Sequence, residues 1–142
     1  MTVRFLLDTN VLCEPLRQAP DPIILERFDR HRAEICTASV AWHELLFGME
    51  RLPTSRRRKT IEDYIATLVA GSLPLPILPY DAPAAAWHAE ERARLESRGR
   101  PAPFRDGQIG AIARTRDLTL VTANPRDFRR LSGLIVVDWS EA

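Results

Sequence analysis

The sequence has little glycine and no long apolar segment, and each shortage excludes a class of protein. Only six of the 142 residues are glycine, and they follow no period, which excludes collagen-like and other fibrous repeats. No apolar stretch approaches the ~20 residues that a membrane-spanning helix needs. The first apolar run ends at Asp8, where a signal peptide would continue, so we expect a cytoplasmic protein without membrane attachment.

Cysteine and lysine are also scarce. The two cysteines, Cys13 and Cys36, lie in no Cys-X-X-Cys motif and have no histidine at ligand spacing, which excludes a sequence-recognisable zinc site. Cys36 lies in an apolar run and is predicted to be a buried, inert thiol. Lys59 is the only lysine among 20 basic residues, which face 19 acidic ones. This arginine bias fits a GC-rich genome, and equally phosphate binding, because the guanidinium contacts phosphate oxygens in pairs.

Short apolar runs alternate with helical patterns along the chain. The expected strands are runs that end at turn residues, at 3–7, 35–37, 75–78, 118–121 and 134–137. The expected helices show apolar residues at helical spacing or follow a capping residue, at 11–16, 22–32, 40–52, around 61–68, 81–98, 107–116 and around 127–131. This alternation predicts an α/β domain over residues 1–142 with a mostly parallel sheet, in which the proline-containing third strand lies at an edge.

Acidic residues follow several of the expected strands. Asp8 comes directly after the first strand, and Glu44 lies about one turn into the helix after the second, a helix that Ser39 is expected to cap. Asp106 is expected to head the helix that leads into the fourth strand. Since ligands of open α/β sheets bind at the carboxyl ends of the strands, we expect these three carboxylates to meet in one cleft.

Each acid alone has an ordinary explanation. Asp8 and Asp106 are suited to be helix N-caps, and Glu44 is suited to an exposed helix face. Together, however, like charges in one cleft destabilise each other unless a positive group lies between them. A divalent cation is the expected group. Oxygen ligands without histidine or cysteine favour Mg²⁺ or Mn²⁺ over Zn²⁺, and three carboxylates leave open whether one or two ions bind.

Five segments in this order resemble the PIN-domain ribonucleases, and more closely the VapC-type toxins of bacterial toxin–antitoxin modules. They are FLLDTNVL (5–12), TASVAWHEL (37–45, with Gly48 and Arg51 beyond), LPYD (78–81), DGQIGAIA (106–113) and LVTANPRDF (120–128). The resemblance implies a PIN-like three-layer α/β/α sandwich with a mostly parallel central sheet. It also implies a Mg²⁺- or Mn²⁺-dependent endoribonuclease that cleaves an RNA substrate, forms a homodimer and is inhibited by a cognate antitoxin.

The resemblance also assigns roles to single residues. Asp8, Glu44 and Asp106 match the catalytic and metal-binding acids of the family. Thr9 and Thr122 match the small hydroxyl residues beside the metal.

The fourth acidic position of the family is not matched cleanly. Many members have aspartate where this chain has Asn124, and Asp127 lies three residues further along. The sequence leaves open which of the two takes this position, as a ligand or as a partner of a ligand.

Arginines near the expected cleft are candidates for RNA contact. Arg98, Arg100 and Arg105 flank the proline-rich loop just before Asp106, and we expect them to bind the phosphate backbone. The basic run at 56–59 is the densest of the chain, and it is either a further RNA contact or the solvated start of a helix.

Other acid-rich or nucleotide-binding folds fit less well. A response-regulator receiver needs a lysine after its last strand, and Lys59 lies in mid-chain. No GxxxxGK or GxGxxG motif occurs, which argues against nucleotide binding on those folds. The remaining alternative is a PIN-like domain that binds RNA or a protein without cleavage. Asn124 at the fourth acidic position favours it, and the three intact acids favour an enzyme.

Overall fold

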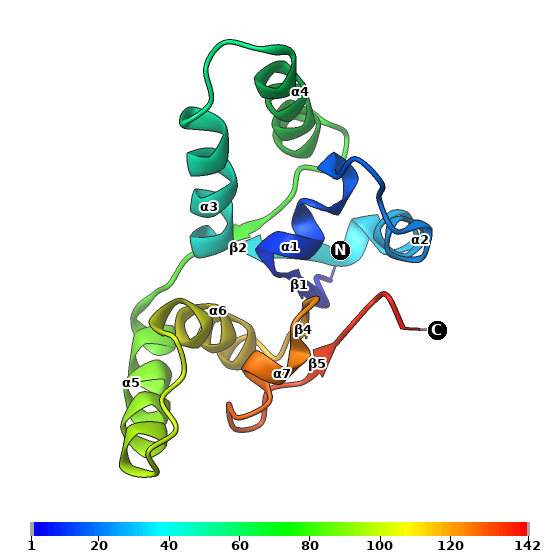
Figure 1. Ribbon diagram of the computed structural model, residues 1–142. Coiled ribbons are helices and arrows are strands. Elements are labelled where there is room, and N and C mark those ends of the chain that lie inside the picture. The colour runs from blue at the N-terminus through cyan, green and yellow to red at the C-terminus, as the bar shows by residue number, and fades with distance from the viewer. Residues whose placement is uncertain (1, 142) are drawn as a thin grey trace.

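A five-stranded parallel sheet lies at the centre of the computed structural model, which describes residues 2–141 (Figure 1). The strands are β1 (Phe5–Leu7), β2 (Ile35–Ala38), β3 (Ile77–Leu78), β4 (Thr119–Val121) and β5 (Val136–Val137). Their order is β3-β2-β1-β4-β5, and each pairing between neighbours is parallel. The expected parallel sheet is therefore confirmed, as is the place of the third strand at an edge.

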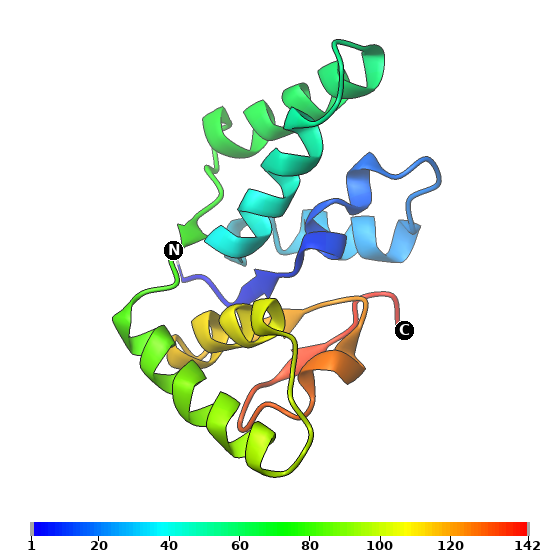
Figure 2. The same cartoon turned by 60° about the vertical axis from the view of Figure 1, so that its left-hand side comes forward.

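Helices cover both faces of this sheet. They are α1 (Thr9–Leu12), α2 (Pro22–Arg30), α3 (Ser39–Glu50), α4 (Arg56–Ala70), α5 (Ala82–Ser97), α6 (Phe104–Thr115) and α7 (Pro125–Phe128). In both views α1 to α4 lie on one side and α5 to α7 on the other (Figures 1 and 2). This is the expected three-layer α/β/α sandwich. Within residues 2–141, no helix is both long and apolar enough to cross a bilayer.

The central strand β1 is buried on both faces of the sheet, which explains its unbroken apolar sequence. Phe5 and Leu7 pack in the cluster beneath α1 to α4, whereas Leu6 packs with Ile109 of α6 on the opposite face. A strand buried on both faces reads as continuous apolar sequence instead of an alternating pattern. Cys36 of β2 is fully buried, as predicted.

Two helices begin earlier than expected. Ser39 is the first residue of α3, and the N-cap is Ala38, which makes no side-chain capping bond. Similarly, α6 begins at Phe104 after the N-cap Pro103, so Asp106 lies within the first turn and does not head the helix. Pro103 has φ −53° and ψ 140°, the non-helical backbone geometry that an N-cap residue adopts. The carboxylate of Asp106 is therefore available for tertiary contacts.

Two shorter segments also differ from expectation. The helix expected over 11–16 is divided at Cys13 into α1 and a 3-10 turn over Glu14–Leu16, and Pro15 lies within the first positions of that turn. The helix expected around 127–131 is α7, which begins at Pro125 and ends at Phe128.

Candidate active site

Asp8, Glu44 and Asp106, hereafter the acid cluster, come together around one guanidinium group. Arg105 Nη2 lies 2.7 Å from Asp8 Oδ1, its Nε lies 2.7 Å from Glu44 Oε1, and its Nη1 lies 2.8 Å from Asp106 Oδ1. The acids come from three elements, since Asp8 is the N-cap of α1, Glu44 lies in α3 and Asp106 in α6. The parallel sheet thus brings side chains from positions 8 to 106 to one edge.

Two threonines hold two members of the acid cluster, Asp8 and Glu44. Thr122 Oγ1 donates a 2.8 Å hydrogen bond to Asp8 Oδ2, and Asp8 Oδ1 accepts from the backbone N–H of Thr9 at 2.8 Å. Thr9 Oγ1 donates to Glu44 Oε1 at 2.7 Å and accepts from Arg105 Nη2 at 2.9 Å. Asp8 is only 2% exposed, so these bonds replace the water it has lost. Both threonines are therefore placed to orient the carboxylates.

Burial and charge act in opposite directions on the ionisable groups here. Burial by itself lowers the pKa of Arg105, but the charge of Asp8 and the hydrogen bond to Glu44 outweigh burial and raise that pKa above its usual value. Burial raises the pKa of Asp106, and the hydrogen bond from Arg105 only partly reverses this. Arg105 is therefore held in its charged form, while the ionised form of Asp106 is disfavoured.

The positive group between the acids is an arginine where a divalent cation was expected. Within residues 2–141, no group of three or more histidine, cysteine, aspartate or glutamate side chains is arranged to hold a metal ion. The three acids fit Mg²⁺ or Mn²⁺ chemically, because every side-chain atom that they offer as a metal ligand is a carboxylate oxygen. The space between those oxygens, however, is filled by the guanidinium of Arg105.

Arg105 was expected to contact RNA, and in this arrangement its guanidinium binds the acid cluster instead. The sequence held one signal for this, since Arg105 directly precedes Asp106 at the start of a helix. It held no signal that the side chain would also reach Asp8 and Glu44.

The two candidates for the fourth acidic position lie outside these ion pairs. Asn124 is exposed and is the N-cap of α7 without a side-chain capping bond, although its backbone N–H donates to Thr122 Oγ1 at 3.1 Å. Asp127 is exposed in the first turn of α7, and its charge is near enough to raise the pKa of Asp106 further. Only Asp127 therefore acts electrostatically on the acid cluster.

Arg98 and Arg100 lie in a separate cavity of about 510 Å³, hereafter the arginine cavity. Its lining consists of Leu95 and arginines from α5, the loop after α5, α7 and the segment that follows α7, namely Arg94, Arg98, Arg100, Arg126, Arg129 and Arg130. Two of these are fixed by the fold, because Arg94 pairs with Glu91 and Arg130 donates to the carbonyl of Pro101. The arginines after β4 were not among the predicted site residues, although their density at 126–130 is visible in the sequence.

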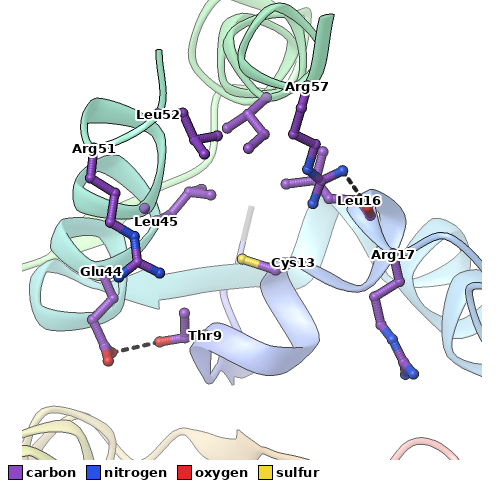
Figure 3. A pocket seen from close by; sticks show the side chains of 11 residues that line it. Thr9, Cys13, Leu16, Arg17, Glu44, Leu45, Arg51, Leu52 and Arg57 are labelled. Carbon is purple, nitrogen blue, oxygen red and sulfur yellow. Dashed lines mark hydrogen bonds between the residues drawn. The ribbon is translucent and has the colours of Figure 1, made fainter. Parts of the chain in front are cut away.

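A second cavity, of about 350 Å³, opens beside Thr9 and Glu44 (Figure 3). Its lining is apolar apart from those two and three arginines: Cys13, Leu16, Leu45, Gly48, Leu52 and Ile61, with Arg17, Arg51 and Arg57. Figure 3 shows the sulfur of Cys13 directed into this space. Burial and the charge of Glu44 raise the pKa of Cys13 to about 11, so its thiol stays protonated at neutral pH. The protonated thiol is the less reactive form of cysteine.

The basic run at 56–59 begins α4, preceded by the N-cap Ser55. Arg57 Nη1 donates to the carbonyl of Leu16, and Lys59 pairs with Asp63 at 2.8 Å. These contacts support the interpretation of the run as a helix start.

Known proteins match this chain over almost its whole length. Residues 5–134 match the PIN domain family. The tRNA(fMet)-specific endonuclease VapC of Shigella flexneri is 34% identical over 139 residues, which cover 97% of this chain and 99% of that protein.

Solved structures match in fold as well. FitAcB from Neisseria gonorrhoeae superimposes with a TM-score of 0.85 at 29% identity, over 97% of this chain and 99% of that one. DNA-bound VapBC from Salmonella typhimurium superimposes with a TM-score of 0.79 at 32% identity, over 96% and 98% of the two chains. With its three-layer fold and full-length relatives, this chain belongs to the PIN domain family.

Proposed function

We propose that this protein is an endoribonuclease that hydrolyses RNA phosphodiester bonds and acts as the toxin of a toxin–antitoxin module. The acid cluster carries the proposal, because three carboxylates from distant parts of the chain meet at one edge of the sheet. The relatives support it, since the Shigella flexneri protein is a tRNA-specific endonuclease and aligns over nearly the whole of both chains.

We propose Mg²⁺ or Mn²⁺ as the cofactor, with Asp8, Glu44 and Asp106 as the residues that would hold it. A bound divalent cation neutralises charge on a phosphate and lowers the pKa of its water. Asp8, with both of its oxygens hydrogen-bonded, is the fixed member of the set. The Glu44 side chain is 37% exposed, compared with 3% and 9% for Asp8 and Asp106, so Glu44 is the acid best placed to orient or deprotonate an attacking water.

RNA is proposed to contact the arginine cavity. Among the residues described, Arg98, Arg100, Arg126 and Arg129 form no ion pair, and the three helical or loop segments that carry them face one space. A cation without a protein counter-charge is free to bind a phosphate oxygen. Such contacts hold the backbone and do not select a base sequence.

An antitoxin is the proposed protein partner. One structure that this chain resembles, VapBC-5 from Mycobacterium tuberculosis, is described as a member of a family of toxin–antitoxin systems, and it superimposes with a TM-score of 0.67 at 26% identity over 96% of both chains. A relative from Neisseria gonorrhoeae that is 27% identical over 137 residues is named Toxin FitB. We propose that a small protein encoded beside this one binds the chain and suppresses its activity, and that the chain itself forms a homodimer.

Cleavage of total RNA by the purified, antitoxin-free chain tests the proposed activity. Cleavage is expected with Mg²⁺ or Mn²⁺ and is expected to stop in excess chelator. Asp8→Asn, Glu44→Gln and Asp106→Asn should each lower the rate by about 10²-fold or more, as loss of acid–base or charge-stabilising groups commonly does. Asp63→Asn is the matched control, because Asp63 is an exposed carboxylate paired only with Lys59. Undiminished cleavage in chelator, or full activity in any of the three variants, contradicts the proposal.

A PIN-like domain that binds RNA without cutting it is the second candidate. The observation in its favour is that Arg105 occupies the acid cluster, while Asn124 stands at the fourth acidic position. Retention of intact RNA by the wild-type chain in saturating Mn²⁺, with no cleavage products, would establish this alternative.

A further inference from the structure

The guanidinium of Arg105 makes a different bond with each of its three nitrogens. Nε donates to Glu44, Nη1 to Asp106, and Nη2 to both Asp8 and the hydroxyl of Thr9, at distances of 2.7 to 2.9 Å. Each acid therefore receives a charge-assisted hydrogen bond, the strongest kind that a protein side chain offers a carboxylate. The planar fork of arginine allows three directions at once, which a lysine ammonium on its flexible stem does not reproduce.

Charge balance in the acid cluster favours a cation in this place. Two of the carboxylates have side chains that are at most 9% exposed, so water screens their repulsion poorly. Arg105 supplies one positive charge against three negative ones, and it does so from the residue next to Asp106 in the chain. Since it is tethered, it closes the cluster without the loss of translational freedom that a free ion incurs.

The side chain of Arg105 is nevertheless able to leave. It is 34% exposed, far more than the two aspartates beneath it, and the ion pairs and hydrogen bonds described for this side chain are all made by its guanidinium. Rotation about the side-chain bonds exchanges these partners for water without movement of α6. Asp8 and Glu44 would keep their threonine contacts after this change, because those come from Thr122 and Thr9, whereas the carboxylate of Asp106 would exchange its bond with Arg105 for water.

We infer that Arg105 is a tethered counter-cation that closes the acid cluster of the free chain and competes with a divalent cation for the same oxygens. Metal binding then requires Arg105 to swing out, and the affinity for metal is reduced by the free energy of its contacts. This inference rests on the proposed function, since it concerns the same three carboxylates. It assigns Arg105 to control of the site, in place of the simple RNA contact that the sequence predicted.

Mn²⁺ titration of the full, antitoxin-free chain by isothermal calorimetry tests the competition without any measurement of activity. Arg105→Gln should bind Mn²⁺ at least about tenfold more tightly than wild type, a difference of about 1.4 kcal/mol, because metal binding to this variant displaces no charge-assisted hydrogen bonds of an arginine. Arg105→Lys keeps the charge but not the three-way geometry, and its affinity should lie between the two.

Arg116→Gln is the matched control. Arg116 is the C-cap of the same helix, and its Nη2 lies 2.8 Å from Asp81 Oδ2, so this variant also removes an arginine–aspartate pair. Its Mn²⁺ affinity should equal that of wild type.

Thermal unfolding in chelator gives a second measurement. Arg105→Gln should melt below wild type, because its three carboxylates face each other without a counter-charge, and Mn²⁺ should raise its melting temperature by more than it raises that of wild type. Arg105→Lys provides the same comparison where Arg105→Gln does not fold.

The outcomes separate this inference from the proposed function. Equal or weaker Mn²⁺ binding by Arg105→Gln overturns the inference, while metal-dependent cleavage of RNA by wild type would still support the enzyme. Tighter binding by Arg105→Gln that is abolished by adding Asp8→Asn supports the inference even in a chain that cuts no RNA. Absence of Mn²⁺ binding in both wild type and Arg105→Gln overturns it as well.

Discussion

Asp106 is a residue whose ionised form reduces the stability of the folded chain. It is 6% exposed, and burial raises its pKa, with the charges of Asp8 and Asp127 acting in the same direction and the hydrogen bond from Arg105 acting against them. When the folded-state pKa of an acid is raised, ionisation of that acid makes the folded state less stable relative to the unfolded state. A neutral residue of the same shape removes this penalty.

Asp106→Asn should therefore raise the melting temperature by a few degrees at neutral pH in chelator. The lost interaction with the dipole of α6, about 0.3–1 kcal/mol, acts against this gain. Differential scanning calorimetry measures the change, with Asp63→Asn as a control that leaves it unaltered. A lower melting temperature for Asp106→Asn would show that the pair with Arg105 outweighs burial.

Asn124 and Asp127 are distinguished by their effect on the acid cluster. Since the charge of Asp127 acts on Asp106 and the neutral side chain of Asn124 carries none, Asp127→Ala should weaken Mn²⁺ binding several-fold, and Asn124→Ala should change it little. Titration of both variants with Mn²⁺ gives the comparison. A larger loss for Asn124→Ala would assign the fourth acidic position to the amide.

The candidate acids could be found from the sequence, and the arginine among them could not. Asp8 directly follows the first strand, and Glu44 lies about one turn into the helix after the second strand. The carboxyl ends of the strands lie at one edge of a parallel sheet, so these two acids are expected there. Arg105 carries a long side chain whose direction depends on the three-dimensional positions of acids up to 97 residues away. Local sequence gives no information on that direction.

Helices α5 and α6 approach each other closely at Gly107 of α6. A Cβ at Gly107 would overlap the ring of His88, and that ring is buried and bonded through Nδ1 to the hydroxyl of Tyr80 at 2.7 Å. In contrast, a Cβ at Gly48 of α3 would meet no atom within 4 Å. A substitution at Gly107 therefore tests the close packing of α5 against α6, whereas a substitution at Gly48 tests helix propensity alone.

Gly107→Ala should reduce the free energy of unfolding by about 1–3 kcal/mol, the usual effect of overpacking. Gly48→Ala should increase it by about 0.5–1 kcal/mol, because alanine is the better helix former. Urea unfolding of both variants measures the difference. Stabilisation by Gly107→Ala would contradict the close approach of the two helices.

Glu91 joins α5 to the segment that precedes β5. It is 6% exposed and accepts from Arg94 and from the backbone N–H of Ser132 at 2.8 Å. The hydrogen bond with Arg94, together with those from Ser132, lowers the pKa of Glu91 from 4.5 to about 2. An acid with a lowered pKa stabilises the fold above its unfolded-state pKa, and this stabilisation is lost as the pH falls.

The free energy of unfolding of Glu91→Gln should therefore be lower than that of wild type, on the order of 2–3 kcal/mol at neutral pH, as a pKa shift of this size implies. The difference from wild type should shrink as the pH falls from about 4.5 toward 2. Glu90→Gln, an exposed neighbour on α5, is the control. Denaturant unfolding at several pH values makes the measurement, and a difference independent of pH would contradict the ion pair.

Element positions were predictable wherever the pattern was long. The expected helix 81–98 matches Ala82–Ser97, because Asp81 caps it and apolar residues repeat along it. Helix starts were wrong at Ser39 and Asp106: Ser39 is the first helical residue after the extended Ala38, and α6 already begins at Phe104, two residues before Asp106.

Self-association belongs to the scale of the whole molecule. Large apolar side chains remain exposed on different elements, among them Phe47 at 56% and Ile135 at 64%. Apolar side chains scattered singly in this way are common on protein surfaces, so the predicted homodimer rests on the resemblance to the VapC-type toxins. Sedimentation velocity of the antitoxin-free chain should show a species of twice the 16.1 kDa chain mass. A single species at the chain mass over the whole concentration range would refute the homodimer.

The order of strands in the sheet also governs when the acid cluster is completed during synthesis. β1 lies between β2 and β4, and Asp8 depends on the hydroxyl of Thr122 directly after β4. A ribosome releases Asp8 early and Thr122 only near the end of the 142 residues. Without β4, the central strand has a free edge and the first acid lacks one of its two hydroxyl or amide anchors. A nascent chain therefore contains Asp8 long before it contains Thr122, so the site cannot be complete until β4 has been synthesised. In an unfinished translation product the acids stay apart.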